Sequence, residues 1–93
     1  MRFSSLNPEW SNEQKYISFD CPCQHPKCHR VCIPIDTRGS GGWDAIDRHD
    51  FEKITINPSI RRIPNEIQCG YHFNVVLGEI QFHPSDSIPF KES

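Results

Sequence analysis

Short runs of apolar residues alternate with polar stretches that contain proline and glycine along most of the chain. Residues 15–20 are rich in aromatic and β-branched side chains, and residues 29–35 begin with alternating polar and apolar positions. Both patterns are typical of β-strands, and the two strands are expected to pair antiparallel. Pro34 places part of the second strand at a sheet edge, because proline cannot donate a ladder hydrogen bond.

The middle of the chain allows two interpretations. Residues 43–46 and 53–56 can form a hairpin across a polar turn, whereas a short helix would extend from Trp43 to Phe51. The apolar positions fit a 3.6-residue stripe only in part, so the hairpin is favoured. Pro58 is expected to end the second of these strands.

A last hairpin is predicted near the C-terminus, where Gly78-Glu79 separates the apolar run 73–77 from Ile80-Gln81-Phe82. Two apolar runs joined by a pair that contains glycine are typical of a tight turn. The sequence therefore predicts a small mostly-β domain of five to six short antiparallel strands with little helix. The predicted organisation is an N-terminal arm at residues 1–14, a single domain at residues 15–83 and a C-terminal tail at residues 84–93.

Length and composition limit the possible classes of protein. The chain has 93 residues, of which 35% are hydrophobic and 24% charged, so it forms one small domain whose core alone gives marginal stability. A net charge of −2 argues against a strongly basic, non-specific nucleic-acid binder. No apolar run approaches the ~20 residues that span a bilayer, and the first residues lack the apolar stretch of a secretory signal. A cytoplasmic protein without membrane contact is expected.

Cysteine is the most informative residue type. The chain has five cysteines, and four of them fall between positions 21 and 32. In a reducing compartment such a cluster more often binds a metal than forms disulfides. One structural zinc ion is predicted, because structural zinc prefers four thiolate or imidazole ligands supplied by two turns.

The candidate zinc ligands lie in two segments that are far apart in the sequence. They are Cys21, Cys23, Cys28, Cys69 and His72. Cys69 and His72 form a pair on one tight turn and are the first choices, with Cys28 next. Cys21 and Cys23 compete across a single proline, so which four residues bind stays open. Cys32 is expected to be a core residue.

Several short segments follow one another in a distinctive order. They are Phe19-Asp20-Cys21-Pro22-Cys23, Cys28-His29-Arg30-Val31-Cys32-Ile33-Pro34-Ile35, Ile54-Thr55-Ile56-Asn57-Pro58-Ser59-Ile60, Cys69-Gly70-Tyr71-His72-Phe73 and Gly78-Glu79-Ile80-Gln81-Phe82. Together they resemble a small zinc-binding family of bacterial and phage proteins of unknown function. Its pattern runs Cys-Pro-Cys-Gly-Cys-Gly, an apolar strand, Thr-Leu-x-Pro-Ser-Ile, Cys-x-Ser-His-Tyr and a Gly-x-Ile hairpin. The chain departs from it at Gln24-His25-Pro26-Lys27, which replaces one glycine, and at Gly70-Tyr71, which replaces x-Ser.

Some members of that family lie beside genes for ubiquitin-like conjugation and deconjugation machinery. The resemblance therefore implies an accessory role in a bacterial ubiquitin-like or phage-defence system. It also implies that the protein acts in the cytoplasm of a bacterium, or of the host cell if a phage encodes it.

The chain lacks the common catalytic motifs. It contains no His-Glu-x-x-His, no Gly-x-Ser-x-Gly and no deaminase signature, and five available ligands favour a closed zinc site. Enzyme activity is therefore less favoured than a non-catalytic, zinc-stabilised adaptor that binds a protein partner. The candidate contact residues are Trp43, Arg61, Arg62 and Tyr71. The alternatives are binding of nucleic acid by basic residues near the metal loop, a small zinc enzyme that acts on a thioester, and a phage-encoded inhibitor of host defence.

Overall fold

The computed structural model describes residues 1–91, and most of their regular structure is β-strand. These residues form seven strands and three short 3-10 helices, and they contain no α-helix. In chain order the elements are η1 (Phe3–Leu6), β1 (Glu9–Ser11), β2 (Tyr16–Phe19), β3 (Val31–Pro34), η2 (Arg38–Ser40), β4 (Asp44–Ile46), β5 (Thr55–Arg61), β6 (His72–Val76), β7 (Glu79–Phe82) and η3 (Pro84–Asp86). The prediction of a small mostly-β fold is confirmed, with seven strands instead of five to six.

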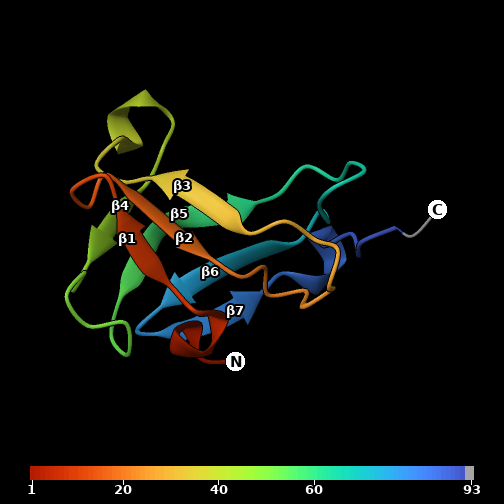
Figure 1. Ribbon diagram of the computed structural model, residues 1–93, viewed down its shortest axis with the longest axis horizontal. Helices are drawn as coiled ribbons and strands as arrows, with labels where there is room; N and C mark the ends of the chain where they lie inside the picture. Colours follow the sequence, from red (N-terminus) through yellow and green to blue (C-terminus); the bar gives the residue numbers. More distant parts are fainter. Residues whose placement is uncertain (92–93) are drawn as a thin grey trace.

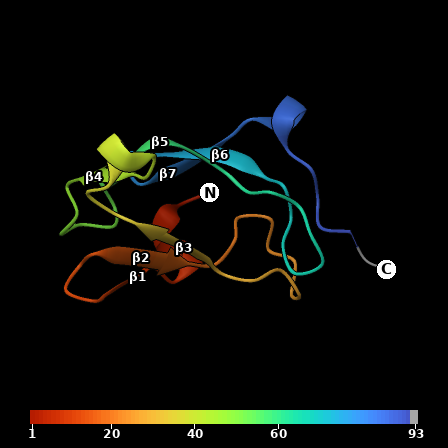
Figure 2. The same cartoon turned by 90° about the horizontal axis from the view of Figure 1, so that it is seen from above.

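The strands form two antiparallel sheets that lie in two layers (Figures 1 and 2). One sheet has the strand order β1-β2-β3 and the other has the order β4-β5-β6-β7. Burial follows the two-residue period of a strand: in β6, Phe73 and Val75 are buried, whereas His72 and Asn74 on the opposite face are partly accessible. The four-stranded sheet therefore has one face toward the core and one face toward solvent.

Three phenylalanines connect the two layers. The ring centroid of Phe19 in β2 lies 4.9 Å from that of Phe3 and 6.2 Å from that of Phe73 in β6, and both contacts are edge-to-face. Phe3 belongs to the segment 1–14 that the sequence predicts to be an arm. The structure packs this segment into the fold, because Phe3 and Leu6 are buried in the core and β1 pairs with β2.

The hairpin predicted for the middle of the chain is present as β4 and β5, with Asp44 opposite Asn57. The expectation that Pro58 ends the second strand is wrong. β5 continues through a cis Asn57–Pro58 bond to Arg61, and its register against β6 shifts between Ile56 and Ile60. A proline can be accommodated there because its missing N–H falls in the irregular part of the ladder.

The predicted C-terminal hairpin is formed by β6 and β7 around the turn at Leu77 and Gly78. Both residues have positive φ, 48° and 76°, as the preferred two-residue hairpin turns require. A Cβ at Gly78 would lie only 2.2 Å from the carbonyl oxygen of Glu52, so this position needs glycine. The turn fixes the register of the hairpin and places His83 directly after β7, where its N–H donates to the carbonyl oxygen of His72 at 2.9 Å.

The segment after β7 folds back onto the molecule. Residues 84–93 are predicted to be an extended tail, but Pro84–Asp86 form η3 and Ile88 makes a β-bridge with Gly70. Residues 92–93 lie outside the described part of the chain. In Figure 2, η3 stands on the side of the four-stranded sheet that faces away from the three-stranded sheet.

Cys32 is exposed and not a core residue, because the alternation along β3 buries Val31 and Ile33 instead. Within residues 1–91, no helix has the length and apolar character needed to cross a membrane.

Candidate functional site

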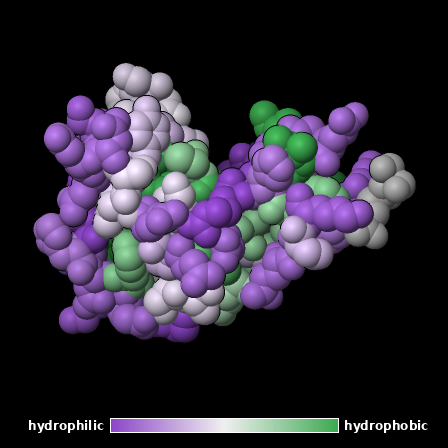
Figure 3. Space-filling view, in the orientation of Figure 1, coloured by the Kyte–Doolittle hydropathy of each residue, from purple (hydrophilic) through white to green (hydrophobic). Residues whose placement is uncertain are grey.

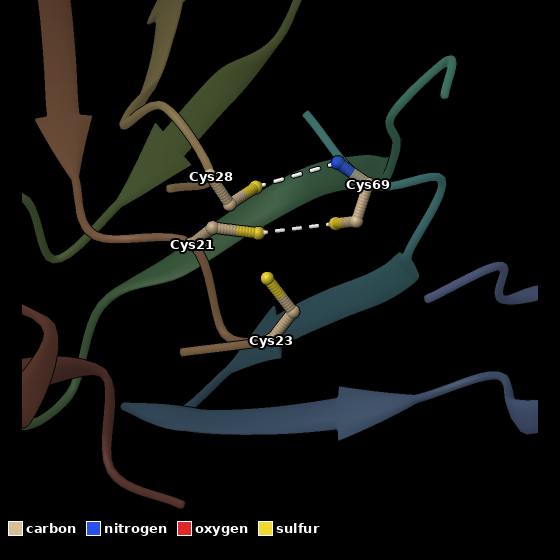
Figure 4. A group of neighbouring side chains, drawn as sticks. All are labelled: Cys21, Cys23, Cys28 and Cys69. Carbon is tan, nitrogen blue, oxygen red and sulfur yellow. Dashed lines mark hydrogen bonds between the residues drawn. The ribbon is translucent and has the colours of Figure 1, made fainter. Parts of the chain in front are cut away.

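Four cysteines converge at the end of the molecule where loops from the two sheets meet (Figure 4). The Sγ atoms of Cys21, Cys23, Cys28 and Cys69 all lie within 4.8 Å of one another. Those of Cys21 and Cys69 are 3.4 Å apart. Four thiolates around one zinc ion, at about 2.3 Å each, would have their sulfurs about 3.8 Å apart. The cluster could therefore hold a metal ion.

The loop between β2 and β3 supplies three of these thiols. Cys21 follows β2 almost directly and is buried, and the chain then turns back through Gln24, whose φ is 58°. Cys28 lies on the return path, where its Sγ accepts a hydrogen bond from the Cys69 N–H at 3.3 Å. The cluster thus joins a loop of the three-stranded sheet to the segment that leads into β6.

Arg62 lies beside the cluster and is buried, with 8% of its surface exposed. Its guanidinium donates to the Cys28 Sγ at 3.4 Å, to the His29 carbonyl oxygen at 2.7 Å and to the Gln68 Oε1 at 2.7 Å. A buried cation next to sulfur ligands offsets the negative charge that thiolates would bring. The structure therefore places Arg62 in support of the cluster, although the sequence suggested it as a surface contact.

The thiols of the cluster differ in how readily they ionise. Burial raises the pKa of Cys23 to about 11 and also raises the pKa of Cys69. Burial opposes ionisation of Cys21 as well, but hydrogen bonds from the Cys23 backbone and from Arg62 outweigh it and lower the pKa of that thiol. A metal ion that binds here must displace the protons of at least Cys23 and Cys69, the two thiols whose pKa is raised.

The structure does not bring His72 to this cluster. His72 is the first residue of β6, and its side chain lies on the outer face of the four-stranded sheet, where its Nε2 is 2.8 Å from the Oγ of Ser59 in β5. The alternation of β6 explains this placement, because Phe73 must point into the core and its neighbour then points outward. Among residues 1–91, the metal candidates that the structure groups together are the four cysteines.

A carboxylate approaches the other nitrogen of the same imidazole. The Oδ2 of Asp86 in η3 lies 3.6 Å from the His72 Nδ1, and its Oδ1 lies 3.6 Å from the guanidinium of Arg61. The His72 Nδ1 is buried and has no partner within hydrogen-bonding distance in the described part of the chain. Ser59, His72 and Asp86 thus form the series of hydroxyl, imidazole and carboxylate in which a histidine can deprotonate a serine.

The bulge in β5 positions the serine. Between the pairs Ile56–Val75 and Ile60–Phe73, three residues of β5 face a single residue of β6. A bulge of this kind bends a strand and redirects its side chains. After the shift, Ile60 pairs with Phe73 and Arg61 with His72, so Ser59, one residue before the buried Ile60, lies on the outer face beside His72.

The family comparison agrees with this geometry. Residues 4–83 match the family described as bacterial ubiquitination-like system serine protease (BubE). The chain belongs to the BubE family. Comparison with curated protein sequences and with solved structures gives no significant match. The predicted association with bacterial ubiquitin-like systems is confirmed at this level.

Membership of the BubE family corrects the functional prediction. A non-catalytic adaptor was expected because no common catalytic motif occurs in the sequence, but the family is one of serine proteases. The sequence reasoning named His72 as a metal ligand and did not single out Ser59 or Asp86, the two residues that the structure places beside it. A signal was present, since Pro58-Ser59 and His72 both belong to the pattern that carries the family resemblance.

In this BubE-family chain, two hollows are lined by sequence neighbours of the serine and the histidine, such as Ile60 and Tyr71. A hollow of about 230 Å³ lies between β3 and the end of β5 and is lined by Val31, Cys32, Ile33, Trp43, Ile60, Arg61, Arg62, Ile63 and Gln68. The surface in Figure 3 is indented along its upper edge, between two hydrophobic areas. A second hollow of about 360 Å³ is lined by Tyr71, Phe82, Pro84, Ser87 and Pro89.

One hydrogen bond connects each hollow to the backbone of Ser59 or of His72. The Trp43 indole N–H in the first donates to the Ser59 carbonyl oxygen at 3.3 Å, and Ser87 in the second accepts a hydrogen bond from the His72 N–H at 3.0 Å. The four residues predicted to contact a partner divide between them: Trp43, Arg61 and Arg62 line the first hollow and Tyr71 lines the second.

Proposed function

We propose that this protein is a serine protease in which Ser59 is the nucleophile, His72 is the general base and Asp86 orients His72. The observation that carries the proposal is the 2.8 Å contact between the Ser59 Oγ and the His72 Nε2 on a partly accessible sheet face. A serine hydroxyl is a weak nucleophile until an adjacent base removes its proton. Both side chains come from neighbouring strands, and such rigid elements hold a reactive pair in place.

In the proposed reaction, the Ser59 Oγ attacks the carbonyl carbon of the substrate while its proton moves to the His72 Nε2. The protonated imidazole then gives this proton to the leaving group as the carbon–leaving-group bond breaks, which leaves an ester on Ser59. Water, deprotonated by the same nitrogen, hydrolyses that ester and regenerates the hydroxyl. Asp86 stabilises the imidazolium through the Nδ1–H, after its carboxylate closes the 3.6 Å separation.

The substrate class follows from the family and from the shape of the site. Since the family belongs to a ubiquitination-like system, we infer that the protease cleaves the amide bond between the C-terminal carbonyl carbon of that system's ubiquitin-like modifier and the group attached to it. Through Trp43 and Ser87 the two hollows contact the backbones of Ser59 and His72, and they offer concave surfaces for a substrate chain near these two residues. The protein partner of the enzyme is then its substrate.

We propose further that Cys21, Cys23, Cys28 and Cys69 hold one structural Zn²⁺. Four sulfur ligands fit zinc, and four protein ligands leave no open position for a substrate or water. The ion would stabilise the end of the molecule from which β6 begins. The proposed hydrolysis depends on Ser59, His72 and Asp86 and needs no chemistry from the metal.

Labelling with a fluorophosphonate probe tests the proposed nucleophile. The wild-type chain is expected to become covalently labelled at Ser59, and Ser59→Ala is expected to lose the label and to lose hydrolysis of a modifier fused through its C-terminus to a reporter protein. Loss of a nucleophile generally lowers kcat by about 10³-fold or more. Ser85→Ala is the matched control, because Ser85 is exposed in η3 and lies outside the proposed triad.

Peptide mapping of the labelled protein completes the test. Modification at Ser59 that disappears when His72 is changed to Ala supports the proposed pair. A probe that reacts with neither variant nor wild type, in metal-loaded and folded protein, would contradict the proposed function.

A further inference from the structure

A single segment after β7, residues 83–87, contacts His72 on several sides. The His83 N–H donates to the His72 carbonyl oxygen at 2.9 Å, and the Ser87 Oγ accepts from the His72 N–H at 3.0 Å. The Ser87 Oγ also donates to the His83 carbonyl oxygen at 2.9 Å, which closes the segment on itself. Asp86 from the same segment faces the Nδ1. The segment therefore holds both the backbone and the ring of the proposed base.

The ring of His83 covers one face of the His72 imidazole. The two ring centroids are 4.2 Å apart and the planes differ by 22°, so the rings are stacked. His83 is itself anchored, because its Nε2 donates a hydrogen bond to the Oδ1 of Asn74, which lies two residues after His72 on the outer face of β6. The position of the His72 ring is thus linked to a fixed point on its own strand.

We propose that His83 is a positioning residue for the hydrolysis and that its stacked ring holds the His72 imidazole with Nε2 directed at Ser59. This inference rests on the proposed function. Asp86 alone cannot fix the ring, since its carboxylate is 52% exposed and lies 3.6 Å from the Nδ1, beyond a normal hydrogen bond. The stacked ring and the Ser59 hydroxyl are then the contacts that select this rotamer of His72.

His83 does not replace His72 as the base. Its Nε2 is engaged by Asn74, and its ring contact is with the flat face of His72 and not with the serine. Its effect on the reaction therefore passes through the orientation of His72. Small misplacements of a reacting group lower rates steeply, by up to about 100-fold for 1 Å, so loss of the stacked ring is expected to be measurable.

Two variants of the metal-loaded full chain separate positioning from folding. His83→Ala removes the ring and the anchor, whereas His83→Phe keeps a flat ring over His72 and removes only the hydrogen bond to Asn74. We expect His83→Ala to slow fluorophosphonate labelling of Ser59 by about 10- to 100-fold. For hydrolysis of a p-nitrophenyl ester, kcat should fall in the same proportion and KM should change little. His83→Phe should recover most of both rates.

The possible outcomes distinguish this inference from the proposed function. Wild-type labelling at Ser59 together with an equal rate in His83→Ala would overturn the role of His83 and leave the proposed function intact. The role would also be overturned if His83→Phe were as slow as His83→Ala, or if KM rose while kcat stayed constant. Absence of labelling in folded wild-type protein would remove the proposed function, and with it this inference.

Discussion

Asp86 is the most exposed member of the proposed triad, with 52% of its side chain accessible against 17% for His72. Arg61 lies 3.6 Å from its other carboxylate oxygen. Asp86→Asn removes the charge that stabilises the imidazolium, and we expect kcat to fall about 10- to 100-fold. This loss is smaller than the ~10⁴-fold typical of a fully buried triad aspartate, because water screens an exposed carboxylate. Steady-state hydrolysis of the p-nitrophenyl ester gives the value.

Glu66→Gln is the matched control for that prediction, since Glu66 is an exposed carboxylate in the loop before β6. It should leave kcat unchanged. Equal rates for Asp86→Asn and the wild type would show that the carboxylate does not act on His72.

Among individual residues, the sequence points to the cysteine cluster far more clearly than to the proposed catalytic residues. Several cysteines close together in the sequence of an intracellular protein indicate a metal site. Ser59 and His72 carry no such signal, since both residue types are common on protein surfaces. Their contact depends on how β5 aligns with β6, and the register shift between Ile56 and Ile60 sets that alignment. A side chain that two strands bring together cannot be found from spacing along the chain.

Arg2, the residue directly before η1, connects the N-terminus to β7 and to the loop before β5. Its guanidinium lies 2.6 Å from the Oε1 of Glu79 in β7 and 2.8 Å from the Oε2 of Glu52, and it also donates to the Glu52 carbonyl oxygen. Arg2 lowers the pKa of Glu79 below its ordinary value of 4.5. A carboxylate whose folded pKa is lowered stabilises the fold above its unfolded pKa, and this stabilisation is lost as the pH falls through the folded value.

We therefore expect Arg2→Met to lower Tm at pH 7 by a small amount that shrinks as the pH falls toward 4. Thermal unfolding followed by circular dichroism at a series of pH values measures the difference from wild type. Lys53→Met, which removes a neighbouring positive charge, should not reproduce this pH dependence. A deficit that stays constant with pH would mean that the hydrogen bond to the Glu52 carbonyl oxygen or packing, and not the carboxylate pairs, accounts for the stabilisation by Arg2.

At the level of elements, the alternation of apolar and polar residues and the turn residues between the runs predicted the hairpins β4–β5 and β6–β7. The same reasoning failed for the chain ends. Residues 1–14 are weakly patterned, yet Glu9–Ser11 pair with β2 as an edge strand, where few apolar side chains are needed. η3 is held in place by contacts with the chain around β6, such as the Gly70–Ile88 bridge. Such contacts between distant segments cannot be predicted from the local sequence. The residues that support the proposed catalysis lie in such tertiary contacts.

In the whole molecule, the cysteine cluster and the proposed catalytic residues lie on one continuous path. Cys69 leads through Gly70 and Tyr71 into His72, and the Gly70 N–H donates at 2.7 Å to the carbonyl oxygen of Ile88, two residues beyond Asp86. The cluster also links the loop after β2 to the four-stranded sheet. A metal ion at this point would restrain the approach to both His72 and the 83–87 segment.

Removal of the metal should therefore lower stability and activity together. A small domain has little core to spare, and each 1 kcal/mol lost lowers Tm by roughly 4–8 °C. We expect the metal-free chain and Cys69→Ser to have a Tm at least about 10 °C lower and to label Ser59 more slowly, even at temperatures where they stay folded, because the chain before His72 is no longer restrained. Cys32→Ser is the matched control for the metal prediction, since Cys32 is exposed and outside the cluster.

This variant should keep one zinc per chain, the wild-type Tm and the wild-type labelling rate. If returning zinc to the metal-free chain restores both the Tm and the labelling rate, the ion is responsible for them. A folded, metal-free chain that labels Ser59 at the wild-type rate would show that the cluster does not affect the proposed catalytic site.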